Sequence, residues 1–317
     1  MEARQERVGE AEEGKTGMSL YFANDPNETP NEQDAPSMEG SAEPESITPP
    51  RRIPHLGHAL AFISFTGLLL VLLELVFAAV GKATGGMHGG VTTLLRPKLQ
   101  IALLATTYLT TLLAAWFFFP QMWQKRFLDG IEWRWAIARG HTSRLIALGL
   151  LLGMMMQVVA HFITPPKTLP VDAFFMTPMD AWLITLFGTI LAPVFEEICF
   201  RGFLLPACAI AYDWLSLPRT EGARMRWQTT TSLTPAAWLF SAVLTSVVFA
   251  LLHATQVAHV WNALLVLFSI SLLLTWVRLK TGSVAASAMV HGAYNGFIFL
   301  LLMLQTGGYR HMERMTQ

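Results

Sequence analysis

Between Trp227 and Val277 the chain contains no Asp, Glu, Lys or Arg. Because one membrane crossing takes about 20 apolar residues, this stretch is long enough to cross a bilayer twice. The whole sequence agrees, since 53% of its 317 residues are hydrophobic and only 14% are charged, with a mean hydropathy of +0.43. These values exclude an ordinary soluble protein and place the chain in a membrane.

Other apolar runs have the length of a membrane crossing. They predict an all-α, polytopic helical membrane protein with about 7–8 transmembrane helices, and residues 208–220 are the candidate for an eighth helix. The seven predicted spans are Leu56–Val80, Leu99–Pro120, Leu145–Phe162, Ala181–Ala207, Ala236–His253, Val260–Val277 and Val284–Leu304.

The charged residues divide the chain at about residue 50. Residues 1–50 hold 12 of the 22 acidic residues and little periodic apolar pattern, which predicts a disordered acidic cytoplasmic tail. Residues 51–170 are interpreted as accessory transmembrane helices and residues 171–310 as a transmembrane core that holds the ionisable residues considered below. Cys199 and Cys208 are the only cysteines. Two cysteines exclude a disulfide scaffold and argue against a cysteine-based metal site.

Basic residues beside the spans indicate the orientation, because they accumulate on the cytoplasmic side. With the N-terminus in the cytoplasm, twelve Lys and Arg residues flank the inner ends of the spans and six flank the outer ends. We therefore expect an integral protein of a bacterial inner (cell) membrane with a cytoplasmic N-terminus. The net charge is zero, and nothing in its distribution indicates binding to nucleic acid.

The fourth span carries the densest set of ionisable groups, which are costly inside a bilayer and therefore mark functional sites. Glu197 and Arg201 stand four residues apart, on one helical face and in the favourable acid-before-base order. Adjacent Glu196 points about 100° away from Glu197 and is left as the unpaired acid. Glu196 is thus the candidate general base for water, although a purely structural ion-pair network fits the same spacing.

Two further spans carry polar residues at i and i+4 spacing. The fifth ends with Phe249 and His253, and the seventh contains His291 and Asn295. Measured along the helices, Glu196 and His291 fall at similar depth, but His253 falls nearer the outer face. That mismatch requires the loop after His253 to dip into the protein, or the fifth span to begin later or tilt.

These three motifs resemble, in order and helical placement, those of the CPBP family, the CAAX protease and bacteriocin-processing intramembrane endopeptidases. The resemblance covers roughly residues 180–305 and implies a peptidase that hydrolyses a peptide bond close to the membrane. It implies that Glu196 activates water, that His253 holds or polarises that water, and that Glu197 and Arg201 form a positioning pair. By the same resemblance, His291 and Asn295 stabilise the oxyanion.

The same resemblance leaves the role of a metal open. Glu196, His253 and His291 form a set that would hold a divalent metal such as zinc, since two imidazoles and a carboxylate do so in hydrolytic zinc sites. No cofactor is otherwise indicated. The expected partners are a membrane-associated peptide or protein substrate and the lipid bilayer.

Other functional classes remain as alternatives. A non-catalytic membrane protein, either bacteriocin-immunity-like or a partner protein, would keep the same polar core for packing, and a transporter would use it to relay protons. The sequence contains neither the Gly-x-Ser-Gly segment of serine intramembrane proteases nor the Gly-x-Gly-Asp segment of aspartyl ones. Cys199 lies in an apolar stretch without an assignable base, so it is a poor candidate nucleophile.

Overall fold

The computed structural model describes residues 50–162, except 84–96, and residues 170–316. All regular elements in these ranges are helices, which confirms the all-α prediction. The predicted disordered tail lies outside the described residues, except for its last residue. All of the described residues belong to one compact unit, 47–317.

Seven helices in the described ranges are long and apolar enough to cross a membrane. They correspond one for one to the predicted spans, with ends that differ by a few residues in most cases. Their bounds are Leu56–Val80, Pro97–Trp123, Thr142–Val159, Pro178–Leu215, Pro235–Leu252, Trp261–Thr281 and Val284–Gln305.

The fourth span differs most from its prediction, because it is one helical rod of 38 residues. Two π-helical segments interrupt its α-helical geometry, and residues 208–215 continue it rather than starting an eighth span. In chain order the rod comprises α6 (Pro178–Leu186), η3 (Phe187–Leu191), α7 (Ala192–Glu197), η4 (Ile198–Leu204) and α8 (Leu205–Leu215).

The length of this rod removes the predicted mismatch in depth. Asp213 near its end accepts hydrogen bonds from the backbone N–H and the hydroxyl of Thr234. Thr234 is the N-cap residue of the fifth span, α10 (Pro235–Leu252). These bonds place the end of α8 level with the start of α10. From that level Glu196 lies about 28 Å along its helix and His253 about 27 Å along its own, at 1.5 Å per residue. The predicted end at Ala207 was too early.

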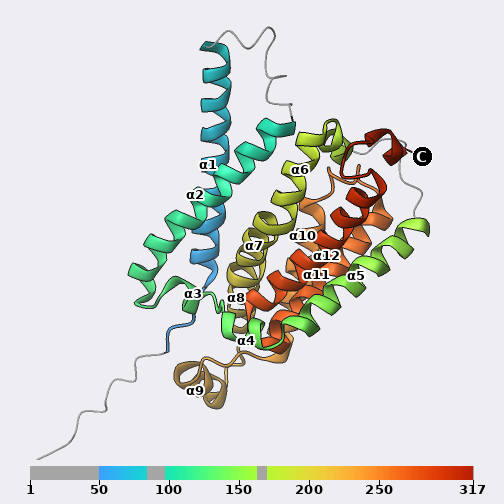
Figure 1. Ribbon diagram of the computed structural model, residues 1–317. Helices are drawn as coiled ribbons and strands as arrows, with labels where there is room; N and C mark the ends of the chain where they lie inside the picture. The colour runs from blue at the N-terminus through green and yellow to red at the C-terminus, as the bar shows by residue number, and fades with distance from the viewer. Residues whose placement is uncertain (1–49, 84–96, 163–169, 317) are drawn as a thin grey trace, which may run out of the picture. The chain divides into compact units, whose positions relative to one another are not determined.

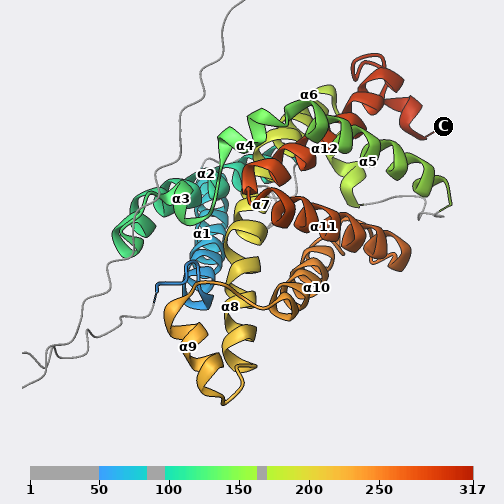
Figure 2. The ribbon, with the colours of Figure 1, turned by 90° about the horizontal axis from the view of Figure 1, so that it is seen from below.

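The remaining helices surround the rod. In Figures 1 and 2, α1 and α2 lie on one side of it, and α5, α11 and α12 lie on the other. Figure 1 shows the short helices α3, α4 and α9 at the lower end, where α1 begins. The bounds are α1 (Leu56–Ala83), α2 (Pro97–Trp123), α3 (Phe127–Gly130), α4 (Trp135–Gly140), α5 (Thr142–Phe162), η2 (Pro170–Phe175), α9 (Glu221–Thr229), α11 (Trp261–Thr281), α12 (Val284–Gln305) and η5 (Met312–Thr316).

Glycines allow α12 to approach its two neighbours closely, as is common where membrane helices pack. A Cβ added to Gly149 of α5 would lie 2.7 Å from the carbonyl oxygen of Val290. A Cβ added to Gly292 of α12 would lie 2.9 Å from the carbonyl oxygen of Thr189 in η3. These two glycines therefore let α12 pack closely against α5 and against the rod.

We expect Gly149→Ala to destabilise the protein by about 1–3 kcal/mol, the usual result of overpacking. The clash falls on backbone and on Ala293, neither of which can rotate away, so it outweighs the gain in helix propensity of up to about 1 kcal/mol. Gly67→Ala in α1 is the matched control, because nothing lies within 4 Å of its added Cβ. Thermal unfolding in detergent measures both variants, and equal transition temperatures would contradict this account.

Candidate active site

The acid pair lies in α7, the short α-helical segment between the two π-helical segments of the rod. A π-helical turn shifts the register of the side chains and leaves carbonyl groups without their usual partners, and such turns occur frequently at functional sites. The side chain of Glu197 is completely buried, whereas that of Glu196 is 18% exposed. The two neighbouring carboxylates therefore have different environments, as their angular separation on a helix predicts.

Glu197 is the centre of a buried polar network. Its Oε1 accepts a hydrogen bond of 2.8 Å from Arg201, so the ion pair expected from the i, i+4 spacing is present. Arg201 also donates to the backbone oxygen and to the hydroxyl of Ser271 in α11, each at 2.8 Å. The side chain of Arg201 is 1% exposed. The network thus neutralises two charges that would be costly to bury singly.

His291 of α12 connects this network to Glu196. Its Nδ1 lies 2.9 Å from Oε1 of Glu197, and its Nε2 lies 3.8 Å from Oε2 of Glu196. Since a carboxylate only accepts hydrogen bonds, we assign the proton to Nδ1. In the neutral imidazole, Nε2 then presents a lone pair to Glu196.

His253 approaches Glu196 from another helix in the same way. It caps the C-terminal end of α10, and its Nδ1 lies 2.8 Å from the carbonyl oxygen of Phe249. A carbonyl also only accepts, so Nδ1 of His253 carries the proton. Its Nε2 lies 3.9 Å from Oε2 of Glu196. Three atoms that accept hydrogen bonds therefore face one another, and none of the described residues places a donor between them.

Asn295 lies one helical turn beyond His291 in α12. Its amide nitrogen donates a hydrogen bond of 2.7 Å to the carbonyl oxygen of Gly188, which belongs to the π-helical segment η3. An amide NH₂ has two donors, so this bond fixes the orientation of the group and leaves one N–H for another acceptor.

These residues line a cavity of about 700 Å³. Glu196, His253, His291 and Asn295 contribute to its wall, whereas Glu197 and Arg201 do not. The other lining residues come from the first turns of α2, from η2, from the rod, from α11 and α12, and from the segment after α10, and several of them are aromatic or aliphatic. The cavity therefore lies toward the end of the bundle opposite the start of α1, and its wall combines apolar surface with one polar cluster.

The donor set of Glu196, His253 and His291 fits a divalent metal chemically. Both histidines direct Nε2 at the carboxylate. Both also have Nδ1 within hydrogen-bond distance of a carboxylate or carbonyl oxygen, as histidines that bind a metal through Nε2 usually do. Nevertheless, no group of three or more His, Cys, Asp or Glu residues is spaced as a metal site in the part of the chain that the structure describes. The types of donor fit a metal, but their present spacing does not form a ready-made site.

Three groups that hold the side chains of this cluster in place were not predicted from the sequence. Ser271 holds Arg201, the carbonyl oxygen of Gly188 holds Asn295, and the ring of Tyr294 stacks on His291 at 5.2 Å between centroids. No sequence signal indicates Ser271, because a serine within a helix can equally bond to a carbonyl oxygen of its own helix. Tyr294 lies between His291 and Asn295 in the sequence, but its stacking depends on the rotamer of His291.

The fold and the site together define a polytopic membrane protein with an acid and histidine cluster in an intramembrane cavity. Residues 178–297 match the family model described as Type II CAAX prenyl endopeptidase Rce1-like. These residues form a domain of that family, which is part of the CPBP family. Membership implies an integral membrane protease that acts on a peptide or protein substrate at the bilayer. No curated protein and no solved structure matches the chain.

Proposed function

We propose that this protein is an intramembrane endopeptidase that hydrolyses a peptide bond of a membrane-associated protein or peptide, with water activated by Glu196. The observation that supports this most directly is the convergence of Oε2 of Glu196 with Nε2 of His253 and of His291, at 3.9 and 3.8 Å. Three acceptors facing one another need a donor between them. A water molecule donates two hydrogen bonds, so it satisfies two of these three acceptors, Glu196 and His253.

In this proposal Glu196 removes a proton from the water as it attacks the substrate carbonyl carbon. The same carboxyl group then delivers that proton to the leaving amine. His253 holds the water through Nε2. Glu196 is the appropriate base because it is the only member of the acid pair that reaches the cavity.

The oxyanion of the tetrahedral intermediate requires hydrogen-bond donors. Asn295 supplies its second amide N–H, because Gly188 occupies only one. His291 is the second proposed contributor, through Nε2, and the carboxylate of Glu197, 2.9 Å from Nδ1, fixes the orientation of its ring. Glu197 and Arg201 act as positioning residues, since they fix the orientation of His291 without touching the cavity.

A metal-assisted version of the reaction uses the same residues. Glu196, His253 and His291 would hold the ion, and a divalent metal supplies Lewis-acid chemistry and a more acidic bound water. The hydrogen bonds at both Nδ1 atoms favour this version to the same extent as the metal-free one. Metal content must therefore be measured together with activity.

We propose residues 51–170 as accessory transmembrane helices and residues 171–310 as the catalytic core. We also propose a bacterial inner membrane location with a cytoplasmic N-terminus, which the distribution of Lys and Arg supports. Prenylated and unprenylated substrates are both compatible with the apolar cavity wall.

The decisive experiment is cleavage of a library of membrane-anchored peptides by the full chain in detergent or liposomes, with metal analysis of the same sample. We expect cleavage that persists after chelation and dialysis if Glu196 acts on water alone. Loss on chelation, with recovery on adding zinc, would instead support the metal-assisted version. A folded, monodisperse protein that cleaves no peptide with or without metals would contradict the proposed function.

A further inference from the structure

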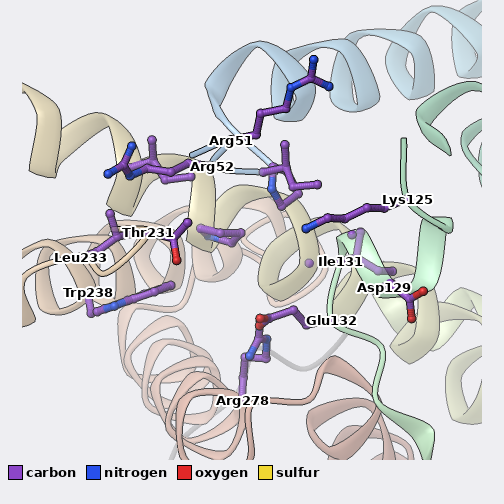
Figure 3. Close-up of a pocket in the computed structure, with 16 residues that line it drawn as sticks. Arg51, Arg52, Lys125, Asp129, Ile131, Glu132, Thr231, Leu233, Trp238 and Arg278 are labelled. Atoms are coloured by element: carbon purple, nitrogen blue, oxygen red, sulfur yellow. The ribbon is translucent and has the colours of Figure 1, made fainter. Parts of the chain in front are cut away.

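A second pocket lies at the opposite end of the bundle, where α1 begins. It has a volume of about 250 Å³ and is enclosed by five separate parts of the chain. These are the segment before α1, the segment from Lys125 to Glu132, α8 with the residues before it, the segment leading into α10, and the end of α11. In Figure 3, Lys125 reaches into the pocket from the side opposite Thr231, Leu233 and Trp238, and Arg278 lies below beside Glu132.

The charges around this pocket do not cancel. Arg51, Arg52, Lys125 and Arg278 line it, against Asp129 and Glu132. Asp129 is paired with Arg126, and Glu132 with Arg134 and Arg278. Among the described residues no salt bridge involves Lys125. The pocket therefore has an excess of positive charge that its own carboxylates do not balance.

Two of its arginines also keep buried donors without acceptors. In both Arg52 and Arg278 the Nε atom is buried and has no hydrogen-bond partner among the described residues, although one terminal nitrogen of each guanidinium donates hydrogen bonds. Arg52 donates to the carbonyl oxygens of Trp227 and Thr230, and Arg278, which is 5% exposed, donates to Glu132. An unsatisfied buried donor is costly, so these atoms indicate an acceptor that binds here.

The environment of Arg52 supports the same conclusion. Burial and the like charge of Arg226 lower the pKa of Arg52, only partly offset by Asp213. Its guanidinium is also fixed in place, with its central carbon 3.6 Å from the centre of the Trp227 ring. An anion would relieve this local excess of positive charge without any movement of the side chain.

The pocket adjoins an apolar groove on the outer surface of the bundle. The groove runs between α10 and α11, has a volume of about 690 Å³ and shares Glu132, Leu233, Trp238 and Arg278 with the pocket. Most of its other lining residues are aliphatic or aromatic, such as Leu239, Leu272 and Trp276. The basic pocket and the largely apolar groove thus lie side by side, on opposite faces of the same four residues.

From this geometry we infer that the pocket and the groove together bind one anionic glycerophospholipid. Its phosphate accepts hydrogen bonds from the arginine and lysine donors, and one acyl chain lies in the groove between α10 and α11. Basic pockets between transmembrane helices bind anionic head groups elsewhere, especially on the cytoplasmic side. The shared chemistry is a phosphate group, and the attached groove assigns it to a lipid rather than to a free anion. This inference does not depend on the proposed catalytic mechanism.

The test is native mass spectrometry of the full chain in detergent with phosphatidylglycerol, phosphatidylcholine or glycerol 3-phosphate. We expect wild type to retain one phosphatidylglycerol in preference to phosphatidylcholine. Lys125→Ala should weaken that retention by about fivefold. This is the loss in affinity expected when one basic residue no longer interacts with an anionic head group. Lys125→Glu should weaken it further, because it places an anion beside the phosphate.

Arg139→Ala and Arg139→Glu are the matched controls. Arg139 is an exposed basic residue of α4 at the same end of the bundle but outside the pocket. Equal losses from the Lys125 and Arg139 variants would reduce the effect to general surface charge and overturn the inference. Binding of glycerol 3-phosphate as tight as that of phosphatidylglycerol would overturn the lipid assignment.

Discussion

We expect Glu196→Gln to lower the rate of peptide cleavage by about 10²–10⁴-fold, the usual contribution of a general base. The amide keeps the shape of the side chain and its place between His253 and His291, but it cannot take a proton from water. Because Glu196 is partly exposed to the cavity and pairs with no arginine among the described residues, the fold should survive the change. Initial rates at saturating substrate, together with the thermal transition, measure the two effects separately.

Glu74→Gln is the matched control for this substitution. Glu74 is also a glutamate within a membrane-spanning helix, but it is exposed on α1 and does not line the cavity around Glu196. We expect its variant to cleave at the wild-type rate. If Glu196→Gln were as active as Glu74→Gln, the proposed role of Glu196 would be wrong.

The second large effect concerns folding. We expect Arg201→Met to destabilise the protein by about 3–5 kcal/mol, because removing one partner of a buried ion pair leaves the other charge uncompensated. The affected charge is Glu197, which has no exposed surface. The two donations to Ser271 are lost as well. Unfolding in detergent with increasing denaturant measures the change.

The double variant Glu197→Gln, Arg201→Met distinguishes this charge effect from lost packing. It removes both charges, so much of the stability should return. Activity should stay low, because the amide weakens the hydrogen bond between position 197 and Nδ1 of His291 that fixes the orientation of this ring. A double variant no more stable than Arg201→Met would show that packing of the arginine, rather than charge, dominates.

The fold was largely predictable because every helix that crosses the bilayer needs about 20 mainly apolar residues. Once these segments are assigned as helices, residues four positions apart share a helical face. The sequence therefore groups Glu197 with Arg201 and His291 with Asn295. The order of the three motifs indicated the family, and the family model matches residues 178–297.

The remaining features depend on contacts that periodicity does not encode. Composition alone ended the fourth span too early, because Tyr212 and Asp213 lower its hydropathy although the helix continues to Leu215. The hydrogen bonds from Thr234 to Asp213 are tertiary contacts, which the hydropathy of one segment does not reveal. The π-helical segments were also missed, and they give Asn295 its acceptor at Gly188. The catalytic roles of the six residues stay predictions that the variants above test.

The cavity and the basic pocket lie at opposite ends of the bundle, and this separation relates membrane topology to substrate choice. A cavity reached from one side of the membrane samples only the peptides of that compartment. With the N-terminus in the cytoplasm, the acid and histidine cluster is reached from the external side, while the basic pocket meets the cytoplasmic leaflet. Reversing the insertion of the same fold would exchange the two compartments without altering one distance in the catalytic cluster.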